Sequence, residues 1–137
     1  GLSLLGNSSW LRESCSDYCH RFRTAALPWI NEGKVQIRHI VVGVLASDSI
    51  AKASTILGSN RPHGAYIKNF ETFRSGGIVP VHAASERGKA QVEANNRLMS
   101  DLGVSATPGI YYKDSTGNVK MRLGLPPESE LNRILNP

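Results

Sequence analysis

The chain has 137 residues, a length typical of one domain, and a formal net charge of +5. Its Lys and Arg residues are scattered, so this charge does not predict nucleic-acid binding. The longest apolar run, residues 40–46, is far shorter than the roughly 18 residues needed to span a bilayer. Two cysteines are too few for a disulfide scaffold, which favours a reactive pair.

The first third of the chain predicts a linker, a helix and a strand. Residues 1–13 are short and polar and are expected to lie as a linker over the surface of a domain at residues 14–137. A strand is predicted at Val35–Ala46, which becomes continuously apolar as in a central strand covered on both faces. Between them we expect a helix at Cys15–Ile30 whose core face carries Phe22, Ala25, Ala26 and Trp29.

A helical insertion is predicted at about residues 47–103. Ser47-Asp48 offers an N-cap for its first helix, which Gly58 ends. The second helix should carry an aromatic stripe that includes Tyr66, Phe70 and Phe73. The third, about residues 85–102, is expected to turn four apolar side chains inward, namely Val92, Leu98, Met99 and Leu102.

The last third predicts a hairpin and a closing helix. Gly109–Lys113 and Val119–Leu123 are β-rich, and the turn-forming residues 114–118 separate them. Val35–Ala46 is expected to lie beside this hairpin, and a final helix should run from Glu128 to Leu135. Together the elements predict an α/β layer fold with a mixed sheet.

Cys15 and Cys19 lie one helical turn apart where the first helix is expected to begin. A cysteine at a helix N-terminus has a lowered pKa, and its thiolate can attack a disulfide. A thiol one turn further on can then resolve the mixed disulfide. The alternative is that both are small apolar residues on one helix face.

Several segments resemble the thioredoxin-fold periplasmic disulfide isomerases of the DsbC/DsbG family, and the DsbG branch most. They are Leu98–Tyr112 around a cis-proline, Pro28–Gln36, Val41–Leu45 and Gly124–Pro126, within a resemblance that covers about residues 18–135. The resemblance implies a thioredoxin-like fold, thiol–disulfide oxidoreductase or isomerase activity without a cofactor, and a periplasmic location. It also implies exported client proteins with cysteines, a membrane thiol reductase as electron donor, and homodimers formed through an N-terminal domain absent from this sequence.

Two features depart from the family pattern. The family motif is Cys-x-x-Cys, and its alignment on Cys19 places Ser16 where the nucleophilic cysteine should stand. Either Cys15 serves as nucleophile in a Cys-x-x-x-Cys site, or serine has replaced the nucleophile. The family also has an apolar strand directly before the motif, whereas residues 10–13 run straight into Ser14-Cys15.

The resemblance and the exchange chemistry together imply roles for other residues. Thr107 and a cis Pro108 would face the substrate, whose extended backbone could pair there like an added strand. Tyr18 would form an apolar lid, and Asp17 would oppose the thiolate by its charge. His20 could stabilise a thiolate when protonated, but we expect it to be a solvated side chain on the second turn.

These observations favour a thiol–disulfide oxidoreductase with Cys15 as nucleophile and Cys19 as resolving thiol. One alternative is a redox-inactive client-binding or chaperone module that kept the fold and lost the nucleophile at Ser16. A weaker alternative is a copper site like that of the Sco proteins. No metal site is predicted, because the remaining histidines have no ligand spacing: His39, His63 and His82.

Overall fold

The structure of the protein is a computed structural model that describes residues 7–13, 17–44 and 47–136. For residues 7–13 and Ser47 only the backbone is described. The elements are β1 Asn7–Glu13, α1 Asp17–Asn31, β2 Gln36–Val42, α2 Ser47–Gly58, α3 Pro62–Glu71, the 3-10 helix η1 Phe73–Ser75, α4 His82–Asp101, β3 Gly109–Lys113, β4 Val119–Leu123 and α5 Glu128–Leu135.

The four strands form one mixed sheet in the order β2-β1-β3-β4. β1 pairs with β2 in parallel and with β3 antiparallel, and β3 pairs with β4 antiparallel. The α/β class with a mixed sheet is therefore confirmed. The hairpin and the closing helix also have the predicted bounds.

The prediction of a linker at residues 1–13 was wrong for Asn7–Glu13, which forms strand β1 in the interior of the sheet. Its sequence, NSSWLRE, has no run of alternating apolar residues that would predict a strand. The pairing uses backbone N–H and C=O groups, which every non-proline residue carries. A strand therefore does precede Ser14, where the sequence indicated none.

The prediction that the apolar strand lies centrally beside the hairpin was also wrong. β2 is at one edge of the sheet, and β1 separates it from β3. Two side-chain amides of α4 bond the end of this edge strand: Asn95 Nδ2 donates to the carbonyl of Val41, and Asn96 bonds both the N–H and the carbonyl of Gly43. α4 therefore covers the end of β2, where Val41 and Val42 are buried.

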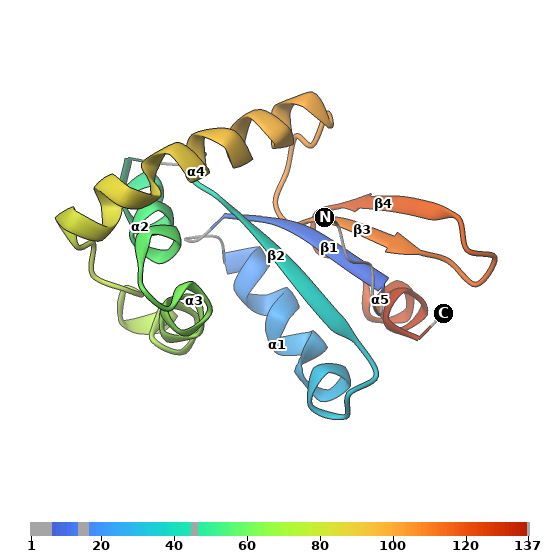
Figure 1. The fold of residues 1–137 in the computed structure, drawn as a ribbon. Helices are drawn as coiled ribbons and strands as arrows, with labels where there is room; N and C mark the ends of the chain where they lie inside the picture. Colours follow the sequence, from blue (N-terminus) through green and yellow to red (C-terminus); the bar gives the residue numbers. More distant parts are fainter. Residues whose placement is uncertain (1–6, 14–16, 45–46, 137) are drawn as a thin grey trace.

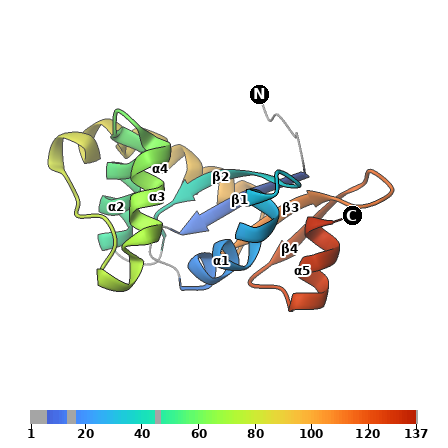
Figure 2. The ribbon, with the colours of Figure 1, turned by 90° about the horizontal axis from the view of Figure 1, so that it is seen from below.

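Helices cover both faces of the sheet, as Figures 1 and 2 show. α1 and α5 pack on one face, in a cluster that contains Phe22, Ile110 and Ile134. α4 packs on the other face through Met99, which shares a cluster with Val42. The predicted inward residues of α5, namely Leu131, Ile134 and Leu135, are buried.

The helical insertion packs as a small unit beside the end of β2. α2 and α4 approach so closely that a Cβ added at Gly58 would lie 1.7 Å from the carbonyl oxygen of Ala84, and one at Gly88 would lie 1.9 Å from that of Ser54. Only glycine fits at this crossing. Two side chains expected to point inward, Leu98 of α4 and Leu102 directly after it, are instead 40% and 44% exposed.

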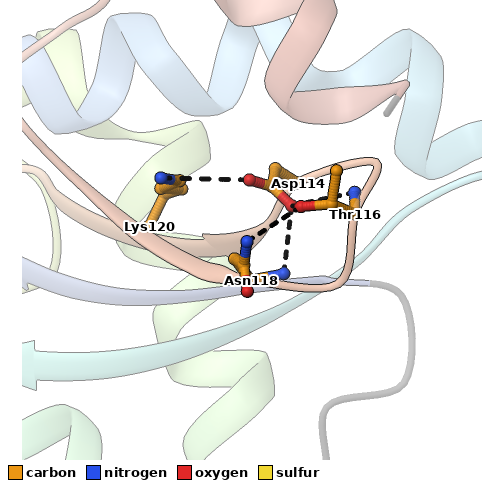
Figure 3. A network of polar contacts seen from close by, with 4 residues as sticks. All are labelled: Asp114, Thr116, Asn118 and Lys120. Carbon is orange, nitrogen blue, oxygen red and sulfur yellow. Dashed lines mark hydrogen bonds and ion pairs between the residues drawn. The ribbon is translucent and has the colours of Figure 1, made fainter.

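The turn between β3 and β4 is organised by one carboxylate (Figure 3). Asp114 Oδ1 accepts hydrogen bonds from the Thr116 hydroxyl (2.6 Å), the Thr116 N–H (2.9 Å) and the Asn118 N–H (3.0 Å). Lys120 Nζ lies 4.0 Å from the other carboxylate oxygen. The hydrogen bond from the Thr116 hydroxyl is the main cause that holds the pKa of Asp114 below its ordinary value.

This lowered pKa predicts a pH-dependent contribution to stability. The folded state favours the ionised carboxylate, so the contribution is complete above the unfolded pKa and is lost as the pH falls through the lower folded pKa. The stability of wild type relative to Asp114→Asn, measured as the difference in unfolding free energy by urea unfolding, should therefore decrease as the pH is lowered from about 5 to about 2. Asp101→Asn controls for the loss of one exposed carboxylate. A wild-type difference from Asp114→Asn that stays constant with pH would contradict the assignment.

Candidate functional site

The N-terminus of α1 and the segment Thr107–Pro108, which we call the proline loop, lie at the same end of the sheet. Leu11 of β1 pairs with Gly109, the first residue of β3. Continuing this antiparallel register by one step places Pro108 level with Arg12, one residue before β1 ends. Because α1 begins at Asp17, only three residues separate the end of β1 from the helix.

Only one of the two cysteines, Cys19, is among the described residues. Cys15 and Ser16, the predicted nucleophile and the residue that replaces the family cysteine, lie outside the described residues. The exposure and lowered pKa expected of Cys15 therefore stay predictions. Cys19 is 1% exposed and lies on the core face of α1. That face also carries Phe22, Arg23 and Ala26, whereas Ala25, expected there, is exposed.

Asp17 and Tyr18 form the first turn of α1 and are largely exposed. The Asp17 side chain is 64% exposed, and its Oδ2 lies 3.9 Å from Nη1 of Arg21. A carboxylate in the first turn favours the helix through the macrodipole. Tyr18 is 56% exposed. Its predicted role as a lid over the thiols depends on the undescribed residues and stays a prediction.

His20 is not the solvated side chain that the sequence predicted. Its imidazole stacks on Phe70 with ring centroids 4.6 Å apart and on Phe73 with centroids 4.4 Å apart. Both partners belong to the insertion, on α3 and η1. His20, the residue after Cys19, therefore packs the first turns of α1 against the helical insertion.

The stack continues deeper along α1 through Arg23, which the sequence analysis did not single out. The guanidinium carbon lies 5.0 Å from the ring centroid of Phe70 and 5.5 Å from that of Tyr66. Tyr66 in turn stacks on His39 of β2, with centroids 4.5 Å apart. Burial lowers the pKa of Arg23, and the charge of Glu71 raises it. The sequence signal that could have pointed to Arg23 is an arginine at a position where the helical spacing predicts a core residue.

The proline loop has the predicted geometry. The Thr107–Pro108 peptide bond is cis, as predicted, and the Pro108 side chain is less than 2% exposed. The Pro108 carbonyl accepts a hydrogen bond from Gly124 N–H (2.8 Å), which joins the loop to the end of β4. A Cβ added at Gly109 would lie 2.6 Å from Val104, so glycine lets the strand approach closely. Thr107 is half-buried, and its contact with a substrate sulfur stays a prediction.

The described part of the chain offers neither a cluster of metal ligands nor a membrane-spanning helix. Among residues 17–44 and 47–136, no group of three or more His, Cys, Asp or Glu side chains could hold a metal ion. No helix within the described residues is long and apolar enough to cross a bilayer.

The sequence of this chain is similar to two known proteins of the same name. No protein-family model matches the sequence. "Thiol:disulfide interchange protein DsbG" of Pseudomonas aeruginosa is 34% identical over 120 residues, or 88% of this chain and 47% of that protein. The protein of the same name from Escherichia coli K12 is 36% identical over 86% of this chain and 48% of that protein. The chain is a relative of the DsbG proteins. It spans about half the length of these two DsbG relatives.

Solved structures confirm the thioredoxin-like fold of this DsbG relative. Proteus mirabilis ScsC in a compact conformation has a TM-score of 0.66 at 15% identity, over 93% of this chain and 80% of that one. A disulfide interchange protein from Neisseria gonorrhoeae has a TM-score of 0.62 at 15% identity, over 93% and 86%. At this level of identity the two likenesses concern the fold alone.

The stack on α1 generates a prediction about stability. Replacing His20 and Phe73 by alanine, singly and together, should reveal a favourable coupling of about 0.5–1.5 kcal/mol in unfolding free energy, because the two rings are stacked. Urea unfolding of the four proteins measures it. His20→Ala combined with Val119→Ala, on the strand farthest from β2, should be additive. A His20/Phe73 coupling near zero would mean that the stack contributes nothing to holding α1 against the insertion.

Proposed function

We propose that the chain carries out thiol–disulfide exchange, with Cys15 as nucleophile and Cys19 as resolving thiol. The observation that carries the proposal is the register of β1 and β3, which brings the start of α1 and the cis-proline loop to one end of the sheet in a relative of DsbG. The helix N-terminus would stabilise the Cys15 thiolate through its unpaired N–H groups and its dipole.

The exchange would proceed in two steps. The Cys15 thiolate attacks one sulfur of a substrate disulfide, a Cys15–substrate disulfide forms, and the other substrate sulfur leaves as a thiolate that takes up a proton. Cys19 then loses its proton and attacks Cys15 Sγ, so that a Cys15–Cys19 disulfide forms and the second substrate thiol leaves. Two electrons pass from the pair to the substrate. In isomerisation a second thiolate of the substrate instead attacks the substrate sulfur of the mixed disulfide, so that a new substrate disulfide forms and Cys15 leaves as a thiolate.

The burial of Cys19 fits a thiol that acts second. A side chain that is 1% exposed is out of reach of a large substrate but could meet the sulfur of Cys15, four residues earlier in the chain. The Cα atoms of a disulfide lie within about 7 Å of each other, a separation that a segment of this length can span. Tyr18, Asp17, Ser16 and His20 would tune the pair.

The proline loop would bind the substrate. The loop lies directly before β3. The backbone N–H and C=O groups of Thr107 could pair with an extended segment of the substrate whose disulfide Cys15 attacks. Clients would be exported proteins with cysteines in the periplasm, with a membrane thiol reductase as electron donor and no cofactor. A homodimer through a separate N-terminal domain is the assembly that the family implies.

A redox-inactive binding module is the second candidate, and Ser16 is the observation that favours it. Serine stands where alignment on Cys19 places the family nucleophile. A serine hydroxyl is not ionised at neutral pH and does not exchange with disulfides. In that case the protein would bind client proteins at the proline loop without exchanging disulfides with them.

Thiol assays distinguish these two candidates. Wild type should reduce a peptide mixed disulfide in the presence of a thiol reductant, and Cys15→Ala should lose at least about tenfold in rate because no thiolate remains at the helix N-terminus. Cys19→Ala should accumulate the mixed disulfide. Inactivity of wild type together with a gain of activity in Ser16→Cys would instead support the binding module and overturn the shifted site.

A further inference from the structure

A groove with four basic side chains lies between the end of α1, the start of β2 and the first turn of α3, away from the proline loop. It measures about 540 Å³, within the range of small-molecule sites. Arg23, Lys34, His39 and His63 line it, and no acidic residue does so in the described structure. We call it the basic groove.

Arg23 is the buried charge of the basic groove. The residue is only 9% exposed, and within the described residues its single side-chain hydrogen bond joins Nη1 to Nε2 of His39 over 3.4 Å. Its Nε is buried and has no acceptor among the described residues. The rings of Tyr66 and Phe70 interact with the guanidinium through cation–π contacts, but they cannot accept its in-plane N–H bonds.

A buried guanidinium is costly unless an acceptor or counter-charge meets its edge. Glu71 on α3 influences Arg23 through its charge, but it makes no ion pair with Arg23 among the described residues and does not line the groove. The His39 imidazole is the hydrogen-bond partner that Arg23 has, and a neutral imidazole offers one acceptor nitrogen. The arrangement therefore leaves the fork of Arg23 short of anionic acceptors.

The rim of the groove allows entry and adds charge. Lys34 and His63 are exposed. Lys34 Nζ lies 2.7 Å from Glu32, and both of these side chains are 56% exposed, so the ammonium can exchange this carboxylate for a ligand at little cost. Ile30 and Ile37, which also line the groove, supply an apolar wall.

We propose that the basic groove binds the oxyanion of a small organic anion, a carboxylate or a phosphate monoester. Arg23 would present its planar donors to two oxygens, as guanidinium groups do to both kinds of anion. His63 and Lys34 would contact the anion from the rim, and Ile30 and Ile37 would contact its apolar part. This site is separate from the proposed thiol chemistry.

Calorimetric titration with three probes tests the proposal: inorganic phosphate, phenyl phosphate and succinate. Wild type should bind phosphate or succinate at one saturable site, and the tighter of the two shows whether the groove prefers a phosphate or a carboxylate. Phenyl phosphate should bind several-fold more tightly than phosphate, because its ring contacts the apolar wall. Arg23→Met should weaken binding by about tenfold or more, because a charge-assisted bidentate contact is lost. Arg21→Met, on the same helix but outside the groove, should change it by less than about twofold.

The proposal stays testable if Arg23→Met does not fold. His63 is exposed, so His63→Gln should fold normally and weaken binding by about threefold, and the imidazole NMR signals of His39 and His63 should shift on titration. Cys15→Ala should bind as wild type does, whatever its redox activity. The absence of saturable binding of all three probes at millimolar concentration would overturn the proposal. So would an equal loss in Arg21→Met and in the groove variants.

Discussion

The pairing of β1 on both of its sides is the constraint on which the candidate site depends. Its parallel partner β2 and its antiparallel partner β3 fix where the chain leaves the sheet after Glu13. Only three residues separate Glu13 from the start of α1, so the helix N-terminus must lie near that end of β1. The same pairing brings Gly109 opposite Leu11, and with it the proline loop. The candidate site is therefore a consequence of sheet register.

A second interaction holds α1 against the insertion. Side chains of α1, α3, η1 and β2 form one continuous stack in the order Phe73, His20, Phe70, Arg23, Tyr66 and His39. Each contact of this kind contributes on the order of 1 kcal/mol, and together they couple the helix that carries Cys19 to α3, η1 and β2. A displacement of α3 would therefore also displace the first turns of α1. Arg23, which belongs to this stack, also lines the basic groove.

The sequence was informative where local signals agree with the tertiary structure. The hairpin at Gly109–Lys113 and Val119–Leu123 and the helix at Glu128–Leu135 have turn residues and apolar spacing that coincide with their bounds. β1 could not be predicted, because its pairing partners rather than its polar sequence make it a strand. The edge position of β2 was missed because α4, not another strand, covers its end. The stacking of His20 depends on Phe70 and Phe73, which are distant in sequence.

Trapping a substrate adduct tests most directly whether the end of β1 and the proline loop frame a thiol–disulfide exchange site. Cys19→Ala, incubated with a peptide that contains one disulfide, should form a mixed disulfide that mass spectrometry locates at Cys15 and that dithiothreitol releases. Cys15→Ala treated in the same way should carry no adduct while folded, because Cys19 is buried. The absence of an adduct at Cys15 in folded Cys19→Ala, with normal labelling of the unfolded chain, would contradict the account.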